Sequence, residues 1–320
     1  MLTQARITFR LHRFTLLAVA AMLLLASVAA LFVAVRLHAT GATPECLASW
    51  RGLPFGGSAT TDCQRRASEF YSIYGAWASP LMGALGGVVP LAGLLAGVAL
   101  VAREIEDRTA AVAWSLATSR TRWLVGRVAP VAALLLGLFA IAAFSATELQ
   151  RARQPSIDPL LSFDNASSRG LEVVAIGMLV FAVAVLVGAV LGRVLPALIT
   201  SAVIGVLLVG GVFISQQAWL PSQADIVDFR SAEAQQGGAL YIDQVIRLSS
   251  GELRSMMEFQ FDENTDGTVT GLPAGATIVG IVVPGSRHPF VDTVLAAVMA
   301  AISAALLALT AFVVRRRRPS

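Results

Sequence analysis

Charged side chains gather in one short stretch of this chain, residues 103–127, which lies between two long uncharged runs. No charge occurs between Glu69 and Arg103, and none between Arg127 and Glu148. Guanidinium and carboxylate groups form hydrogen bonds with water or ion pairs with another protein. We therefore predict a water-facing connector between two membrane spans, and this connector is the best functional clue in the sequence.

The parts of the connector that could bind a partner are a short apolar helix over 110–116, anchored by Trp114, and charged residues on either side of it. Buried aromatic anchors contribute more to an interface than charges at its rim. We take the following as candidate contacts: Arg103, Glu104, Glu106, Arg108, Thr109, Trp114, Arg120, Arg122 and Trp123. The alternative for Arg120 and Arg122 is that they only hold the membrane topology.

Several kinds of chemistry lack their residues in this chain. All 24 basic residues are arginine, so no P-loop lysine can cradle ATP and no Schiff base can form. His12, His38 and His288 all lie outside the expected spans, and no HExxH or GxSxG motif occurs. We therefore expect no catalytic residue, no cofactor in this chain and no enzyme activity of its own.

The two cysteines, Cys46 and Cys63, fall in the same predicted outer loop. An oxidising compartment makes a disulfide the default expectation, and closing a loop of this length would contribute about 3 kcal/mol. Two free thiols are the alternative. Two sulfur ligands without a nearby histidine cluster argue against a metal site.

An acidic turn, Asp262 to Gly267, fits the first half of a calcium-binding loop. The second half fails, because Pro273 stands where a bidentate glutamate belongs. Nearby Val269, Ile278 and Val282 suggest strands, so we expect an acidic turn in place of a calcium site.

Composition places the chain in the membrane. It is 56% hydrophobic and 14% charged with a mean hydropathy of +0.72, against about 25% charged in soluble domains. A span needs about 20 apolar residues. The predicted fold is an all-α membrane protein with six transmembrane helices, at about 14–35, 80–102, 128–147, 173–192, 194–216 and 293–314. Gly192 and Pro196 predict a tight hairpin between the fourth and fifth.

Arginine distribution predicts the orientation. With both termini in the cytoplasm, the inner segments carry 13 Arg against 3 acidic residues, whereas the outer loops 36–79, 148–172 and 217–292 carry 11 against 17. The first span is too long for a signal peptide core, so we expect it to be retained. Residues 1–13 suit an amphipathic helix at the inner membrane surface, a disordered basic tail being the alternative.

Small residues at four-residue spacing in the spans permit close helix packing. Proline in the second span permits a kink. The candidates for packing or hinge positions are Gly83, Gly87, Pro90, Gly93, Gly97, Gly188 and Gly192. Packing within one chain and a seam between two copies both remain open.

The connector, with its approach from Gly97 to Glu106 and the residues Thr109, Trp114 and 119–123, resembles the inner loop of type 2 ABC transporter permeases, in particular an actinobacterial subgroup. Other matching segments are 9–13, 163–164, 169–170, 191–196 and 284–287. Arg108 departs from the glycine that the family often has before the threonine. This departure puts the geometry of the loop just before Thr109 in question.

The resemblance implies a single permease domain over 1–320 in a bacterial cell membrane, with a coupling helix between spans two and three. It also implies a separate ATPase subunit carrying ATP and magnesium, a second permease copy, and outward export. Apolar spans suit an amphipathic, lipid-like, drug or peptide substrate, membrane lipids surround the chain, and no nucleic acid is expected. The rival is a non-transporting scaffold or receptor that binds a ligand through 217–292, and an intramembrane enzyme is third.

Overall fold

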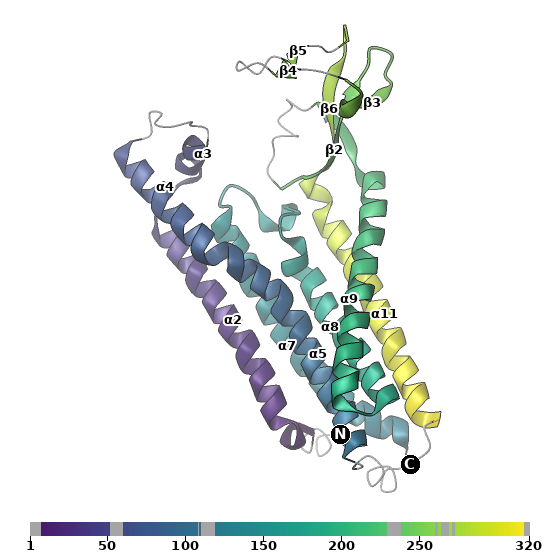
Figure 1. The fold of residues 1–320 in the computed structure, drawn as a ribbon. Coiled ribbons are helices and arrows are strands. Elements are labelled where there is room, and N and C mark those ends of the chain that lie inside the picture. Colours follow the sequence, from purple (N-terminus) through teal and green to yellow (C-terminus); the bar gives the residue numbers. More distant parts are fainter. Residues whose placement is uncertain are drawn as a thin grey trace. The chain divides into compact units, whose positions relative to one another are not determined.

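A computed structural model of the chain describes residues 8–51, 60–107, 109, 119–228, 238–259, 262–263, 269–270 and 273–316 (Figure 1). Six of the described helices are long and apolar enough to cross a membrane. They are α2 (Arg13–Ala39), α5 (Ser79–Glu106), α7 (Arg120–Arg153), α8 (Gly170–Leu191), α9 (Val194–Trp219) and α11 (His288–Arg316). The predicted helical membrane protein with six transmembrane helices is thereby confirmed, and strands occur in addition between residues 225 and 283.

Helix α8 forms the centre of the membrane bundle. It packs against α5 and α7, and α2 packs against both α5 and α7 (Figure 1). Phe139 of α7 and Phe181 of α8 are among the largest fully buried side chains. Helix α8 is buried along most of its length, whereas α9 buries only three of its described residues, Ala197, Ser201 and Gly205.

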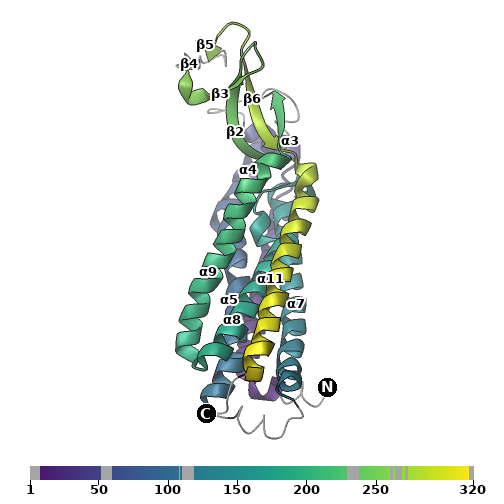
Figure 2. The same ribbon diagram turned by 90° about the vertical axis from the view of Figure 1, so that its right-hand side faces the viewer.

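The described flanks of the connector and both described ends of the chain lie at the same end of the bundle. The first turn of α2, the last turn of α5, the first turn of α7 and the last turn of α11 all lie there (Figure 2). We call this the connector end, and the other end the disulfide end. Which end faces the cytoplasm stays a prediction.

The turn between α8 and α9 is as short as the sequence predicts. Gly192 adopts φ +64°, a conformation that favours glycine, and its N–H donates to the Gly188 carbonyl at 2.9 Å. Pro196 follows in the first turn of α9, where its missing N–H removes no helical hydrogen bond.

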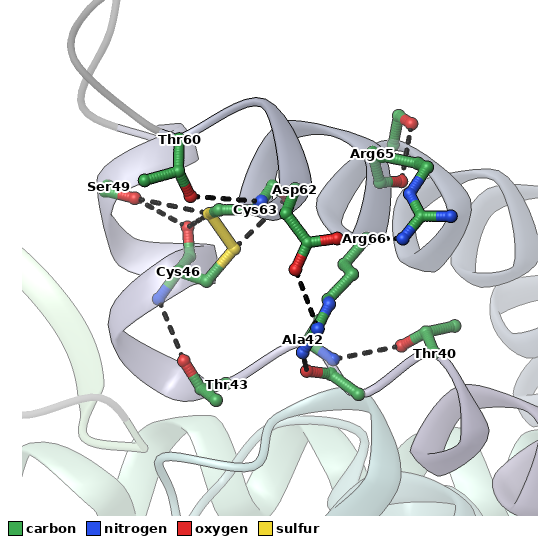
Figure 3. The surroundings of a disulfide bond; sticks show 12 residues. Thr40, Ala42, Thr43, Cys46, Ser49, Thr60, Asp62, Cys63, Arg65 and Arg66 are labelled. Carbon is green, nitrogen blue, oxygen red and sulfur yellow. Dashed lines mark hydrogen bonds and ion pairs between the residues drawn. A yellow bond between two sulfur atoms is a disulfide. The ribbon is translucent and has the colours of Figure 1, made fainter.

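Helices α3 (Pro44–Arg51) and α4 (Thr61–Ile73) form a lobe at the disulfide end. A disulfide joins Cys46 to Cys63 with 5.7 Å between their Cα atoms, and the Thr60 side chain accepts from the Cys63 N–H at 3.3 Å (Figure 3). Arg66 donates to the Gly41 carbonyl at 3.2 Å, which ties α4 to the end of α2. The expected disulfide is therefore present.

Helix α4 continues into α5 through a π-helical turn, η1 (Tyr74–Ala78). Such turns insert an extra residue into a helix and are frequent at functional sites. The apolar pattern of the sequence gives no sign of it, because one inserted residue leaves the composition unchanged.

Residues 156–164 and 213–291 pack as a second compact unit, separate from the bundle formed by the rest. Its antiparallel sheet has the strand order β1-β6-β2-β3, and β4 pairs with β5. The strands are β1 (Asp225–Asp228), β2 (Leu240–Arg247), β3 (Leu253–Ser255), β4 (Asp262–Glu263), β5 (Val269–Thr270) and β6 (Thr277–Val283). Short 3₁₀ turns complete the chain: η2 (Pro159–Leu161), η3 (Ala166–Ser168), η4 (Leu220–Gln223), η5 (Met256–Glu258) and η6 (Gly285–Arg287). A single permease domain over 1–320 stays a prediction.

Within the second unit, the sheet has a small apolar core and two polar ties. Val245 and Ile246 of β2 and Val279 and Val282 of β6 are buried. His288 Nδ1 lies 3.1 Å from the Leu160 carbonyl, and Arg287 pairs with Asp225 at 3.2 Å, so segment 156–164 and β1 are both held to the sequence that follows β6.

Candidate functional site

The end of α5 is joined to its neighbours through the buried side chain of Glu104. One carboxylate oxygen of Glu104 lies 3.4 Å from His12 Nε2 and 3.4 Å from an Arg127 guanidinium nitrogen. Arg127 also donates to the Thr8 hydroxyl at 3.3 Å. Glu104 and His12 are each only 4% exposed. We call Thr8, His12, Glu104 and Arg127 the Glu104 cluster, and it links the N-terminal segment, α5 and α7.

Two further hydrogen bonds connect the flanks of the connector to the remaining helices. The Val194 N–H at the α8–α9 turn donates to the Glu106 carboxylate at 2.8 Å. Arg120 donates to the Arg315 carbonyl near the end of α11 at 3.4 Å. Every transmembrane helix therefore has at least one end within this polar belt or beside it.

The predicted coupling residues separate into a buried and an exposed set. Glu104 and Trp123 are buried, at 4% and 5% exposed, so both lie inside the bundle and not on its surface. Thr109 donates its hydroxyl to the Glu104 backbone carbonyl at 3.1 Å. Four other members are exposed, namely Arg103, Glu106, Thr109 and Arg122, and Arg120 is half-buried. Arg103 pairs with Asp107 at 3.8 Å.

Arg108, Trp114 and the rest of the expected short helix over 110–116 lie outside the described residues. Their role as contacts to a partner stays a prediction. What the structure adds is that both flanks of the connector are anchored, through Glu104 and Glu106 on the α5 side and through Arg120 and Arg127 on the α7 side.

A second polar group at the disulfide end was not singled out from the sequence. Arg153 of α7, 6% exposed, donates to the hydroxyls of Tyr74 and Ser79 at 3.1 and 3.2 Å and to Gln150 Oε1 at 3.0 Å. These bonds hold the π-helical turn against α7. The sequence shows Arg153 as a basic residue shortly after the third span. It does not show which residues surround its side chain.

Acidic residues also fix the start of α8. The Asp292 carboxylate of α11 accepts the N–H groups of Leu171 and Glu172 at 3.2 and 2.9 Å, as an N-cap would. Gly170 precedes them at φ +64°, and Arg169 and Glu172 are 1% and 3% exposed. Interior charges are thus confined to helix ends, in keeping with the uncharged span centres.

The glycines of the spans have two different surroundings. A Cβ added at Gly93 or Gly97 would meet the backbone of α8, and one at Gly188 would touch Ala102 of α5. A Cβ at Gly83 or Gly87 would meet no described atom within 4 Å. The pair Gly93 and Gly97 therefore lies in the contact between α5 and α8. The pair Gly83 and Gly87 has the same spacing but lies on an open face of α5, nearer the disulfide end. Pro90 lies within α5, between these two parts.

No group of three or more histidine, cysteine, aspartate or glutamate side chains that could hold a metal occurs in the described part of the chain. Asp262 and Glu263 belong to β4, and residues 264–268 of the acidic turn lie outside the described ranges.

Beside the disulfide, the carboxyl group of Glu45 accepts hydrogen bonds from its own backbone N–H and from the Thr43 hydroxyl, and these bonds lower its pKa.

The Glu104 cluster joins three segments of the chain at the connector end. A displacement of the connector would act on α5 and α7 at once, because Glu104 bonds to both the N-terminal segment and Arg127. Packed, hydrogen-bonded elements carry such coupling between distant sites.

Much of the chain matches the model of a known family. The model of the family described as ABC-2 membrane transporter related matches residues 14–216. This stretch includes α2, α5, α7 and α8, most of α9, and the whole connector. No curated protein and no solved structure matches the chain. Because the match covers more than half of the sequence, the chain belongs to the ABC-2 membrane transporter related family and is a membrane-embedded type 2 ABC transporter permease.

Proposed function

We propose that this chain is the permease subunit of an ATP-driven exporter, which moves an amphipathic, lipid-like, drug or peptide substrate outward across a bacterial cell membrane. A separate ATPase subunit supplies the energy, and ATP and magnesium bind there. Family membership favours this function over a scaffold or receptor, since ABC-2 permeases in general work with an ATPase.

The absence of lysine supports the division of labour between two subunits. A P-loop needs a lysine that reaches the β- and γ-phosphates, and all 24 basic residues of this chain are arginine. The permease therefore has no enzyme activity of its own in this proposal.

The observation that carries the proposal is the belt of contacts at the connector end. The connector leaves α5 beside Glu104 and Glu106 and re-enters at α7 beside Arg120 and Arg127. Those four residues bond to the N-terminal segment, to the α8–α9 turn and to α11. A partner that pushes on this connector would move the whole cytoplasmic end of the bundle.

Two copies of the chain complete the transport pathway in this proposal. The exposed face at Gly83 and Gly87, one turn apart on α5, would allow close approach of a helix from a second copy. Membrane lipids cover what remains of the exposed apolar surface of α9 and α11.

The direct test is co-expression with a candidate ABC ATPase from the same genome, followed by purification and reconstitution into liposomes. We expect the two subunits to purify together in equal amounts, and ATP hydrolysis to stop when the P-loop lysine of the ATPase is replaced. A permease that purifies without any ATPase, or ATP hydrolysis that survives that replacement, would refute the proposal.

A further inference from the structure

An apolar groove of about 700 Å³ lies at the disulfide end between α2 and the π-helical turn with the start of α5. Its lining includes Ala29, Val33 and Arg36 of α2 and, on the facing helix, Trp77, Leu81 and Ala84. At about 1.5 Å per residue, the wall from Ala29 to Arg36 is about 10 Å long. This wall is thus long enough to line part of an acyl chain.

Arg36 is the single charged residue among those that line the groove. It lies in the last turn of α2, which places its guanidinium near the membrane surface. In the described part of the chain, Arg36 forms no ion pair or hydrogen bond. By contrast, the exposed arginines nearby have acidic partners: Arg65 and Arg66 pair with Asp62, and Arg151 pairs with Glu148.

The π-helical turn presents Trp77 to the groove. Tyr74 turns inward and accepts from Arg153, whereas Trp77, three residues later, is 66% exposed. Tryptophan prefers the headgroup level of a bilayer, where one side of the ring is apolar and the N–H is wet. Trp77 and Arg36 therefore mark the same depth, with the apolar walls below them.

We propose that this groove binds an anionic phospholipid from the surrounding leaflet. The phosphate accepts hydrogen bonds from the Arg36 guanidinium, and one acyl chain lies along Val33, Leu81 and Ala84. A guanidinium at the headgroup level attracts anionic lipids, and a phosphate can accept two hydrogen bonds from it at once. This lipid site is independent of the proposed transport direction and of the ATPase, because it needs the permease alone.

Native mass spectrometry of the purified full chain in detergent can measure the site directly. The chain is titrated with phosphatidylglycerol or with phosphatidylcholine of the same acyl chains. A single arginine near the surface contributes about 1 kcal/mol toward an anionic lipid, so we expect about fivefold tighter binding of phosphatidylglycerol.

Three variants locate the site. Arg36→Gln should remove the preference for phosphatidylglycerol, and Arg36→Lys should keep most of it. Arg151→Gln, which removes the same charge at the same end of the bundle, should leave the preference unchanged. Ala84→Trp, at an exposed position in the wall of the groove, should weaken binding of both lipids by filling the groove.

The proposal is wrong if the unmodified chain binds both lipids equally, since that would show an ordinary lipid annulus. It is also wrong if Arg36→Gln keeps the preference, or if Ala84→Trp binds both lipids as tightly as the unmodified chain. Loss of the preference in Arg151→Gln to the same extent as in Arg36→Gln would show a response to net charge and no specific site.

Discussion

Glu104 illustrates how a residue that looks exposed in the sequence can be central to the packing. It stands among charged neighbours, yet its carboxylate is buried against His12 and Arg127. Removing one member of a buried ion pair leaves the other charge without compensation. A substitution of Glu104 should therefore destabilise the chain far more than a substitution in the exposed Arg103–Asp107 pair nearby.

We predict that Glu104→Gln destabilises the chain by about 3 kcal/mol, because Arg127 and His12 lose their carboxylate partner. Asp107→Asn is the matched control: Asp107 lies one turn away and pairs with Arg103 in the open, so its loss should cost less than about 0.5 kcal/mol. Unfolding by sodium dodecyl sulfate in bicelles gives both values. An equal loss of unfolding free energy in the two variants would mean that the buried Glu104 cluster stabilises the chain no more than an exposed ion pair does.

Between elements, the closest contact is that of α5 with α8, where glycines remove the side chains that would hold the helices apart. We predict that Gly93→Ala destabilises the bundle by about 1 to 3 kcal/mol, because the new methyl group would overlap the Gly177 backbone. Gly87→Ala, on the open face of the same helix, should not destabilise it. Thermal unfolding in detergent would contradict this account if Gly87→Ala were the more harmful change.

The disulfide acts on the α3–α4 lobe. Reduction, or Cys46→Ala with Cys63→Ala, should lower the stability of the lobe by about 3 kcal/mol. The reason is that the unfolded chain gains conformational entropy when the cross-link is removed. Limited proteolysis before and after reduction should show new cleavage between residues 40 and 63 and little elsewhere. Mass spectrometry of unreduced, alkylated protein that found both thiols modified would disprove the bond.

Transmembrane helices were predictable because a span needs about 20 apolar residues in sequence, which is a local property. The disulfide was predictable because the chain has only two cysteines. The partners of Glu104 were not, since His12 lies 92 positions away and no spacing rule joins them. Spacing also marked Gly83 and Gly93 alike, although only the fold decides which of them faces another helix. The strand order β1-β6-β2-β3 likewise depends on pairings between distant segments.

At the scale of the whole molecule, the arginine distribution should fix the orientation. Reporter fusions after residue 60 and after residue 250 should both report the outside, and a fusion after residue 115 should report the cytoplasm. The physical reason is that short basic loops stay on the cytoplasmic side. The opposite result at any one of the three positions would overturn the six-span topology.

The central claim is that the connector passes the movement of a separate ATPase to the bundle. The most direct measurement is substrate-stimulated ATP hydrolysis of the reconstituted complex, with Trp114→Ala and Glu104→Ala as the tests and Arg120→Ala as the rim variant. A buried apolar anchor typically contributes about 2 kcal/mol or more to an interface, so Trp114→Ala should reduce assembly or stimulation more than Arg120→Ala does. If Trp114→Ala and Glu104→Ala both leave assembly and stimulation intact, the connector is not the coupling element.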